Sequence, residues 1–159
     1  MKLRVRDVVR VESPSITRRD LWTTSKASRY YSGTIPAGGE STIINITGRG
    51  KVKGYILCTS GVSPANVEVT MIIDDETIFT LFMSGIIGVF NPNIANVNVP
   101  NYAKPIALLT VDTTNNVYAF SWTTTISFEK SFSIKIKNYD SANDLEYSLP
   151  IHIEEEVGG

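Results

Sequence analysis

The chain has 159 residues, 42% hydrophobic and 19% charged, with a formal net charge of −1; it is too apolar for disorder and suits one domain over 1–159. Its single cysteine, Cys58, excludes an intramolecular disulfide and a cysteine-rich zinc site. No stretch reaches the roughly 20 apolar residues of a membrane span, and the N-terminus lacks the apolar core of a signal peptide, so we expect a protein made in a cytoplasm and not secreted.

The first 32 residues predict a basic strand followed by an arm. Residues 3–12 alternate between two faces and carry several arginines, which is typical of a half-exposed or edge strand. Ser13 and Pro14 end that strand. Residues 17–32 are polar, basic and aromatic, and they are compatible with either a short helix or an extended arm.

From Gly33 onward, alternating apolar and polar positions rich in β-branched residues predict strands separated by turns. Glycines in 36–39 and 48–50 supply the positive φ angles of tight turns. The run 74–76 is expected to form the acidic tip of a hairpin. The predicted strands are 41–47, 52–59, 67–73, 77–82, 106–111, 118–128, 132–137 and 148–154.

Helix is expected to be scarce, because no window carries a sustained apolar stripe at helical spacing. Residues 85–105 predict a long loop with at most one short strand. About eight to ten strands predict an all-β fold, an antiparallel two-sheet sandwich that is jelly-roll-like. Trp122 is expected to be buried, since it shares a strand face with Phe120 and Ile126.

No motif indicates catalysis or a cofactor. His152 lies in a strand-like stretch without a recognisable nucleophile motif, which favours a solvent-facing residue over a catalytic base. The adjacent carboxylates of 74–76 lack the spacing of a calcium loop, and 48–51 lacks the spacing of a phosphate-binding loop. We therefore predict a protein that is not an enzyme and has no catalytic, cofactor-binding or metal site.

Opposite charges gather at the two ends of the chain. Residues 1–30 hold eight of the 15 basic side chains against three acidic ones, and residues 139–159 hold six acidic side chains and no Lys or Arg. Such segregation suits a plain solvated surface or electrostatic docking between neighbouring copies. Docking of the basic arm on nucleic acid is the weaker third alternative.

Residues 33–46, followed by 48–55 and the segment 67–74, resemble structural proteins of tailed-phage and archaeal-virus particles. The shared features are a Pro-Ala-Gly turn before a strand, a Gly-rich turn, and a strand that ends in a Val-x-Ile-x-Ile-Asp-like segment. Here Asp74-Asp75 replaces the Asp-Gly that is usual in that family. The resemblance implies a virion component that forms symmetric oligomers.

The first hypothesis is therefore a viral structural protein, a capsid, decoration, spike or tail-associated component, that is located in the virion and binds itself and other virion proteins. The alternative is a carbohydrate-binding or adhesion module with an exposed aromatic platform. The expected interface residues are Arg4, Arg6, Arg10, Arg18, Arg19, Trp22, Tyr30, Tyr31, Glu154, Glu155 and Glu156.

Overall fold

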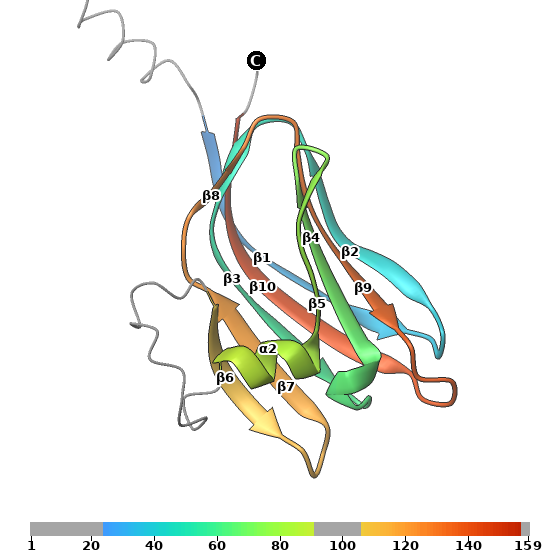
Figure 1. Ribbon diagram of the computed structural model, residues 1–159. Coiled ribbons are helices and arrows are strands. Elements are labelled where there is room, and N and C mark those ends of the chain that lie inside the picture. The colour runs from blue at the N-terminus through green and yellow to red at the C-terminus, as the bar shows by residue number, and fades with distance from the viewer. Residues whose placement is uncertain (1–23, 91–105, 157–159) are drawn as a thin grey trace, which may run out of the picture.

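The computed structural model describes residues 24–90 and 106–156, which form two antiparallel β-sheets packed face to face (Figure 1). Sheet A has the strand order β1-β10-β3-β7-β6, with β8 also paired to β3, and sheet B has the order β2-β9-β4-β5. The elements are β1 (Thr24–Ile35), β2 (Glu40–Thr47), β3 (Gly50–Ser60), the 3-10 helix η1 (Pro64–Asn66), β4 (Val67–Ile73), β5 (Glu76–Phe82), α2 (Met83–Phe90), β6 (Ile106–Asp112), β7 (Val117–Trp122), β8 (Ile126–Phe128), β9 (Ser131–Asn138) and β10 (Leu145–Glu156).

The strand pairs are nested like the two arms of one long hairpin. The first strand pairs with the last (β1 with β10), β2 with β9, β3 with β7, and β4 with β5. Two further pairings, β10 with β3 and β9 with β4, join these ladders into the two sheets. A hairpin rolled up in this way is a jelly roll, so the predicted all-β sandwich is confirmed.

The core lies between the two sheets because alternate residues of each strand turn inward. Strand β9 alternates without interruption between half-buried and fully buried residues. Its inward residues meet those of sheet A, and Phe132 of β9 packs against Phe128 of β8 with 6.0 Å between ring centroids. The largest fully buried side chains are Tyr118, Phe120, Phe128, Phe132, Ile35, Leu57, Met71, Met83, Ile86, Ile134, Ile136 and Leu145.

Three expectations differ from the structure. The expected loop from residue 85 begins instead with helix α2. Its Met83 and Ile86 are fully buried between the sheets. Burial of these apolar side chains stabilises a helix that is too short to show a periodic apolar stripe in the sequence. Residues 24–32 are part of a strand and not a helix or a free arm, because β1 pairs with β10 along its whole length. The expected strand 118–128 is split into β7 and β8, which both pair with β3.

The predicted strand 3–12, residues 17–23 of the predicted arm, and residues 91–105 lie outside the described residues. Within the described ranges, no helix is long and apolar enough to cross a membrane.

Candidate interaction surfaces

Six of the expected interface residues lie outside the described residues: Arg4, Arg6, Arg10, Arg18, Arg19 and Trp22. The other five lie on the paired strands β1 and β10. Tyr30 is 67% exposed on the outer side of sheet A, whereas Tyr31 faces inward and packs against the core. Glu154, Glu155 and Glu156 are half-buried at the end of β10.

Part of the acidic C-terminal strand already meets basic side chains of its own chain. The Arg29 guanidinium donates to both carboxylate oxygens of Glu155, at 3.1 and 2.7 Å, in a bidentate ion pair. The hydrogen bonds to Glu155 raise the pKa of Arg29 further above its ordinary value. Nζ of Lys53 lies 4.0 Å from a carboxylate oxygen of Glu154. The antiparallel pairing of β1 with β10 therefore brings opposite charges together within one chain.

We call the outward side of sheet A the A face. Strand register places its side chains in rows that cross β1, β10, β3 and β7, and the three central rows contain no Asp, Glu, Lys or Arg. Those rows are, in order along the strands, Ser28, His152 and Gly54; then Tyr30, Pro150, Ile56 and Ser121; then Ser32, Ser148, Cys58 and Ala119.

The charged residues of the A face stand in the two end rows. Beyond the first central row lie Glu154, Lys51 and Lys53, and beyond the last lie Glu146 of β10 and Asp112 of β6. The side chain and the backbone N–H of Asn115 donate hydrogen bonds to Asp112 and lower the pKa of that carboxyl, so Asp112 is ionised at neutral pH. The end row that holds Lys51 and Lys53 therefore carries charges of both signs, and the row that holds Glu146 and Asp112 is acidic.

Two shallow hollows of about 380 Å³ each mark the A face. The first surrounds the bare backbone of Gly54, beside the side chains of Ile56, Pro150 and His152. The Ser28 hydroxyl and Nδ1 of His152 lie 3.1 Å apart at its rim. The second hollow is rich in hydroxyl groups and is lined by Tyr30, Ser32, Thr34, Cys58, Ser60, Glu146, Tyr147 and Ser148 among others.

The outward side of sheet B, the B face, carries charged pairs in its middle. Nζ of Lys135 on β9 lies 3.2 Å from a carboxylate oxygen of Glu40 on β2. Nζ of Lys137 lies 4.6 Å from the ring centroid of Tyr139, whose hydroxyl donates to Glu68 at 3.5 Å. Cross-strand charges of this kind are usual on a solvated sheet surface.

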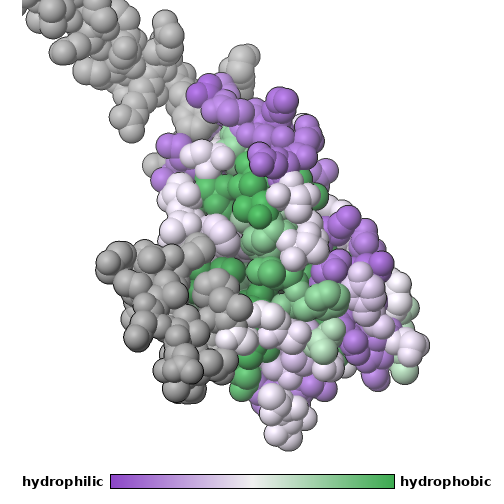
Figure 2. Space-filling view, in the orientation of Figure 1, coloured by the Kyte–Doolittle hydropathy of each residue, from purple (hydrophilic) through white to green (hydrophobic). Residues whose placement is uncertain are grey.

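The side of the sandwich that is turned toward the reader has an apolar centre. Figure 2 shows hydrophobic residues between the strands of the two sheets, with hydrophilic residues at the upper end and along the β2–β9 side. Edge strand β5 exposes Ile78 (45%) and Phe82 (38%), and Phe82 lies on the B face, where its ring centroid is 5.5 Å from that of Tyr139. Phe79 of β5 stacks on Trp122 of β7 with 5.9 Å between the ring centroids.

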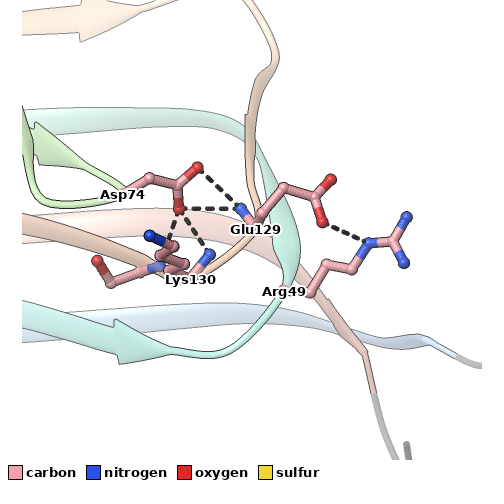
Figure 3. A network of polar contacts seen from close by, with 5 residues as sticks. Arg49, Asp74, Glu129 and Lys130 are labelled. Carbon is pink, nitrogen blue, oxygen red and sulfur yellow. Dashed lines mark hydrogen bonds and ion pairs between the residues drawn. The ribbon is translucent and has the colours of Figure 1, made fainter.

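The acidic tip of the β4–β5 hairpin is hydrogen-bonded to the turn that precedes β9. Asp74 and Asp75 have φ angles of 52° and 68°, as the two central residues of a type I′ hairpin turn require. The Asp74 carboxylate accepts backbone N–H groups of Glu129, Lys130 and Ser131 at 2.6–3.1 Å, which ties the tip of β4–β5 to the turn before β9 (Figure 3). These hydrogen bonds, that of Lys130 first, lower the pKa of Asp74.

The same close-up shows Arg49 in an ion pair with Glu129, with 3.0 Å between Nε and a carboxylate oxygen (Figure 3). This pair joins the turn between β2 and β3 to the turn before β9. Across residues 24–90 and 106–156, no three His, Cys, Asp or Glu side chains come together in a group that could hold a metal ion.

The sequence matches no protein-family model and no curated protein. Among solved structures, the chain is similar to the acidic stable capsid structure of Helicobacter pylori bacteriophage KHP30, at 12% identity and a TM-score of 0.42, over 86% of this chain and 100% of that one. It is also similar to the infectious bursal disease virus VP2 subviral particle (13% identity, TM-score 0.34) and to the Gx strain of that virus (14%, 0.35), each over 86% of this chain and 33% of the other. The chain thus spans about a third of the two infectious bursal disease virus chains.

Proposed function

We propose that the protein is a structural component of a virus particle, a capsid, decoration, spike or tail-associated protein, that assembles with further copies of itself and with other virion proteins. The observation that carries the proposal is the nested pairing of the strands, since jelly rolls of this kind recur in viral capsid domains and in lectins. This step is an analogy between folds. The central rows of the A face, which carry no Asp, Glu, Lys or Arg, and the segregated charges of the chain favour assembly over a solitary domain.

In the proposed assembly, the basic N-terminal residues steer neighbouring subunits. The arginines at 4, 6, 10, 18 and 19 approach the acidic strand β10 of another copy, near Glu154 and Glu156. Complementary charges of this kind set association rate and register more than affinity, so apolar contacts supply most of the binding energy. Trp22 and Tyr30 are the aromatic residues at that end of the chain for this contact, because Tyr31 packs against the core of its own chain.

The test is sedimentation velocity of the full-length chain at low and high salt, beside a variant with all five arginines changed to Gln. Charges that are partly exposed are screened over about 8 Å at physiological ionic strength. We therefore expect the wild-type chain to associate and to do so less at high salt, and the variant to associate less at low salt. A wild-type chain that stays monomeric at every salt concentration overturns the proposal.

A carbohydrate-binding module is the second candidate, and one observation favours it. The exposed ring of Tyr30 stands beside the hollow lined by Ser32, Thr34, Ser60 and Ser148. Aromatic rings stack on sugar rings, and hydroxyl groups donate and accept hydrogen bonds with sugar hydroxyls. A glycan array probed with the wild type and with Tyr30→Ala tests this candidate, which predicts a monomer whose binding signal is lost in the variant.

A further inference from the structure

We propose that the A face is a two-fold interface, in which it packs against the A face of a second copy with the strands of the two sheets antiparallel. This inference rests on the proposed assembly function and names the surface and the geometry. Three observations support it: the central rows without Asp, Glu, Lys or Arg, the area of the face, and the different charges of its two end rows.

The first observation is chemical. An exposed sheet surface that only meets water tolerates charged side chains, as the pair Lys135 and Glu40 shows on the B face of this same molecule. The central rows of the A face carry serine, alanine, glycine and cysteine around Ile56 and Pro150. Charged residues are depleted at the centre of protein–protein interfaces because pairing rarely repays their desolvation. Small residues also let two flat sheets approach closely.

The second observation is the size of the face. Sheet A presents five strands side by side, and neighbouring strands lie about 4.8 Å apart, which makes the face about 24 Å wide. Five rows from Glu154 to Glu146, about 6.7 Å apart, make it about 30 Å long. Two copies in contact would bury about 1,400 Å² in total, which is the size of a standard stable interface.

The third observation decides the orientation. A two-fold axis that crosses the strands reverses one sheet relative to the other, so the end row that holds Lys51 and Lys53 meets the acidic end row with Glu146 of the second copy, and the reverse contact forms by symmetry. An axis along the strands would instead place Lys53 over Lys53 and Glu146 over Glu146. Complementarity therefore selects the antiparallel arrangement.

Tyr30 is the anchor of this interface. Its ring is the most exposed of the large hydrophobic side chains of the described chain and stands between the two hollows, in the middle row of the A face. Tyrosine is enriched among the hot spots of interfaces. A two-fold axis that crosses the strands at the middle row places β1 over β1 of the second copy, so the two Tyr30 rings meet at the axis.

The first test compares two serines in equivalent places. Ser148 lies outward on β10 in the middle of sheet A, and Ser133 lies outward on β9 in the middle of sheet B; both are half-buried. We expect the full-length wild type and Ser133→Arg to give the same dimerisation constant in sedimentation equilibrium, and Ser148→Arg to weaken dimerisation at least tenfold. Thermal unfolding of both variants checks that each is folded.

The second test exchanges the charges of the end rows. Lys53→Glu and Glu146→Lys should each weaken dimerisation several-fold at low salt, and the double variant should recover it, because each new pair is again of opposite sign. Failure of the double variant to recover affinity overturns the antiparallel orientation.

The outcomes separate this inference from the proposed function. If the chain forms larger assemblies that Ser148→Arg leaves intact, the A face is not the interface and the proposed assembly stands. If the wild type is monomeric at every concentration and salt, both proposals fail. If it is monomeric and binds a glycan through Tyr30, the A face is a sugar site.

Discussion

The two outer faces of the sandwich come from similar strands and differ in charge. Strands β9 and β10 both alternate and both bury their inward residues, yet the outward residues of β9 include Lys135 and Lys137, whereas those of β10 in the central rows are Ser148, Pro150 and His152. The inward positions set the fold, and the outward positions decide what each face can meet. A face with charged side chains stays hydrated, whereas rows of small uncharged side chains can be buried against another protein surface.

The largest expected effect lies on the inner side of sheet A. Trp122→Ala should cost about 3 kcal/mol of unfolding free energy, because the indole stacks between Tyr55 and Phe79 and its loss leaves a cavity. The indole is half-buried and not fully enclosed, so the low end of the range for aromatic residues applies. Urea unfolding measures the change.

Trp122→Phe is the matched control. The indole N–H is buried without a hydrogen-bond partner among the described residues, so phenylalanine keeps a stacking ring and removes an unsatisfied donor. We expect a loss below about 1.5 kcal/mol, typical of a substitution of one apolar ring for another. An alanine variant as stable as the phenylalanine variant would contradict the stacked placement and the register of β7.

The next effect concerns the polar link at the tip of sheet B. Asp74→Asn should lower Tm at pH 7, because the amide offers one acceptor oxygen and no charge to the three backbone N–H groups that the carboxylate holds. Folding lowers the pKa of Asp74. The contribution of Asp74 to the free energy of unfolding is therefore fully present above the ordinary aspartate pKa of about 3.9, and it is lost as pH falls through the lower pKa of the folded protein.

The difference in Tm between wild type and Asp74→Asn should therefore shrink at the acidic end of a pH series. Asp75→Asn is the control in the same turn: Asn tolerates a positive φ, and the Asp75 carboxylate makes no hydrogen bond within the described residues. Equal losses in both variants at pH 7 would mean that the turn, and not the link to the β9 turn, sets the effect.

A smaller effect is expected on the B face itself. Lys135→Gln should cost about 0.2–1 kcal/mol at low salt, because its pair with Glu40 is partly exposed, and the cost should fall as salt screens the pair. Denaturant unfolding at two salt concentrations measures it. A cost that is the same at high salt would point to lost packing of the lysine stem.

The smallest effect is expected from removal of metal ions. EDTA should leave Tm unchanged within about a degree, because the Asp74 carboxylate already accepts three backbone N–H groups and the chain has too few soft ligands for zinc. A Tm that falls in EDTA and recovers with added calcium would restore a metal site.

For the candidate surfaces, the sequence identified single residues but not which residues lie next to one another. It marked Tyr30 and the acidic end of β10, but residues 26 and 154 are far apart in the chain, and only the pairing of β1 with β10 shows that they lie opposite each other. The uncharged A face could not be read from the chain, since its rows combine residues 28, 152, 54 and 121 from four strands. The role of Asp74 was equally hidden, because its partners lie more than 50 residues away.

The sequence by itself determined the all-β class, most of the strand positions and the hairpin of β4 and β5, because alternation and turn chemistry act between near neighbours along the chain. Only the tertiary structure decided the nested strand order, the strand at residues 24–32, the helix α2 and the break between β7 and β8. Each of these depends on what a segment packs or pairs against. Hydrogen bonds to β10 hold β1, and burial of Met83 and Ile86 between the sheets holds α2.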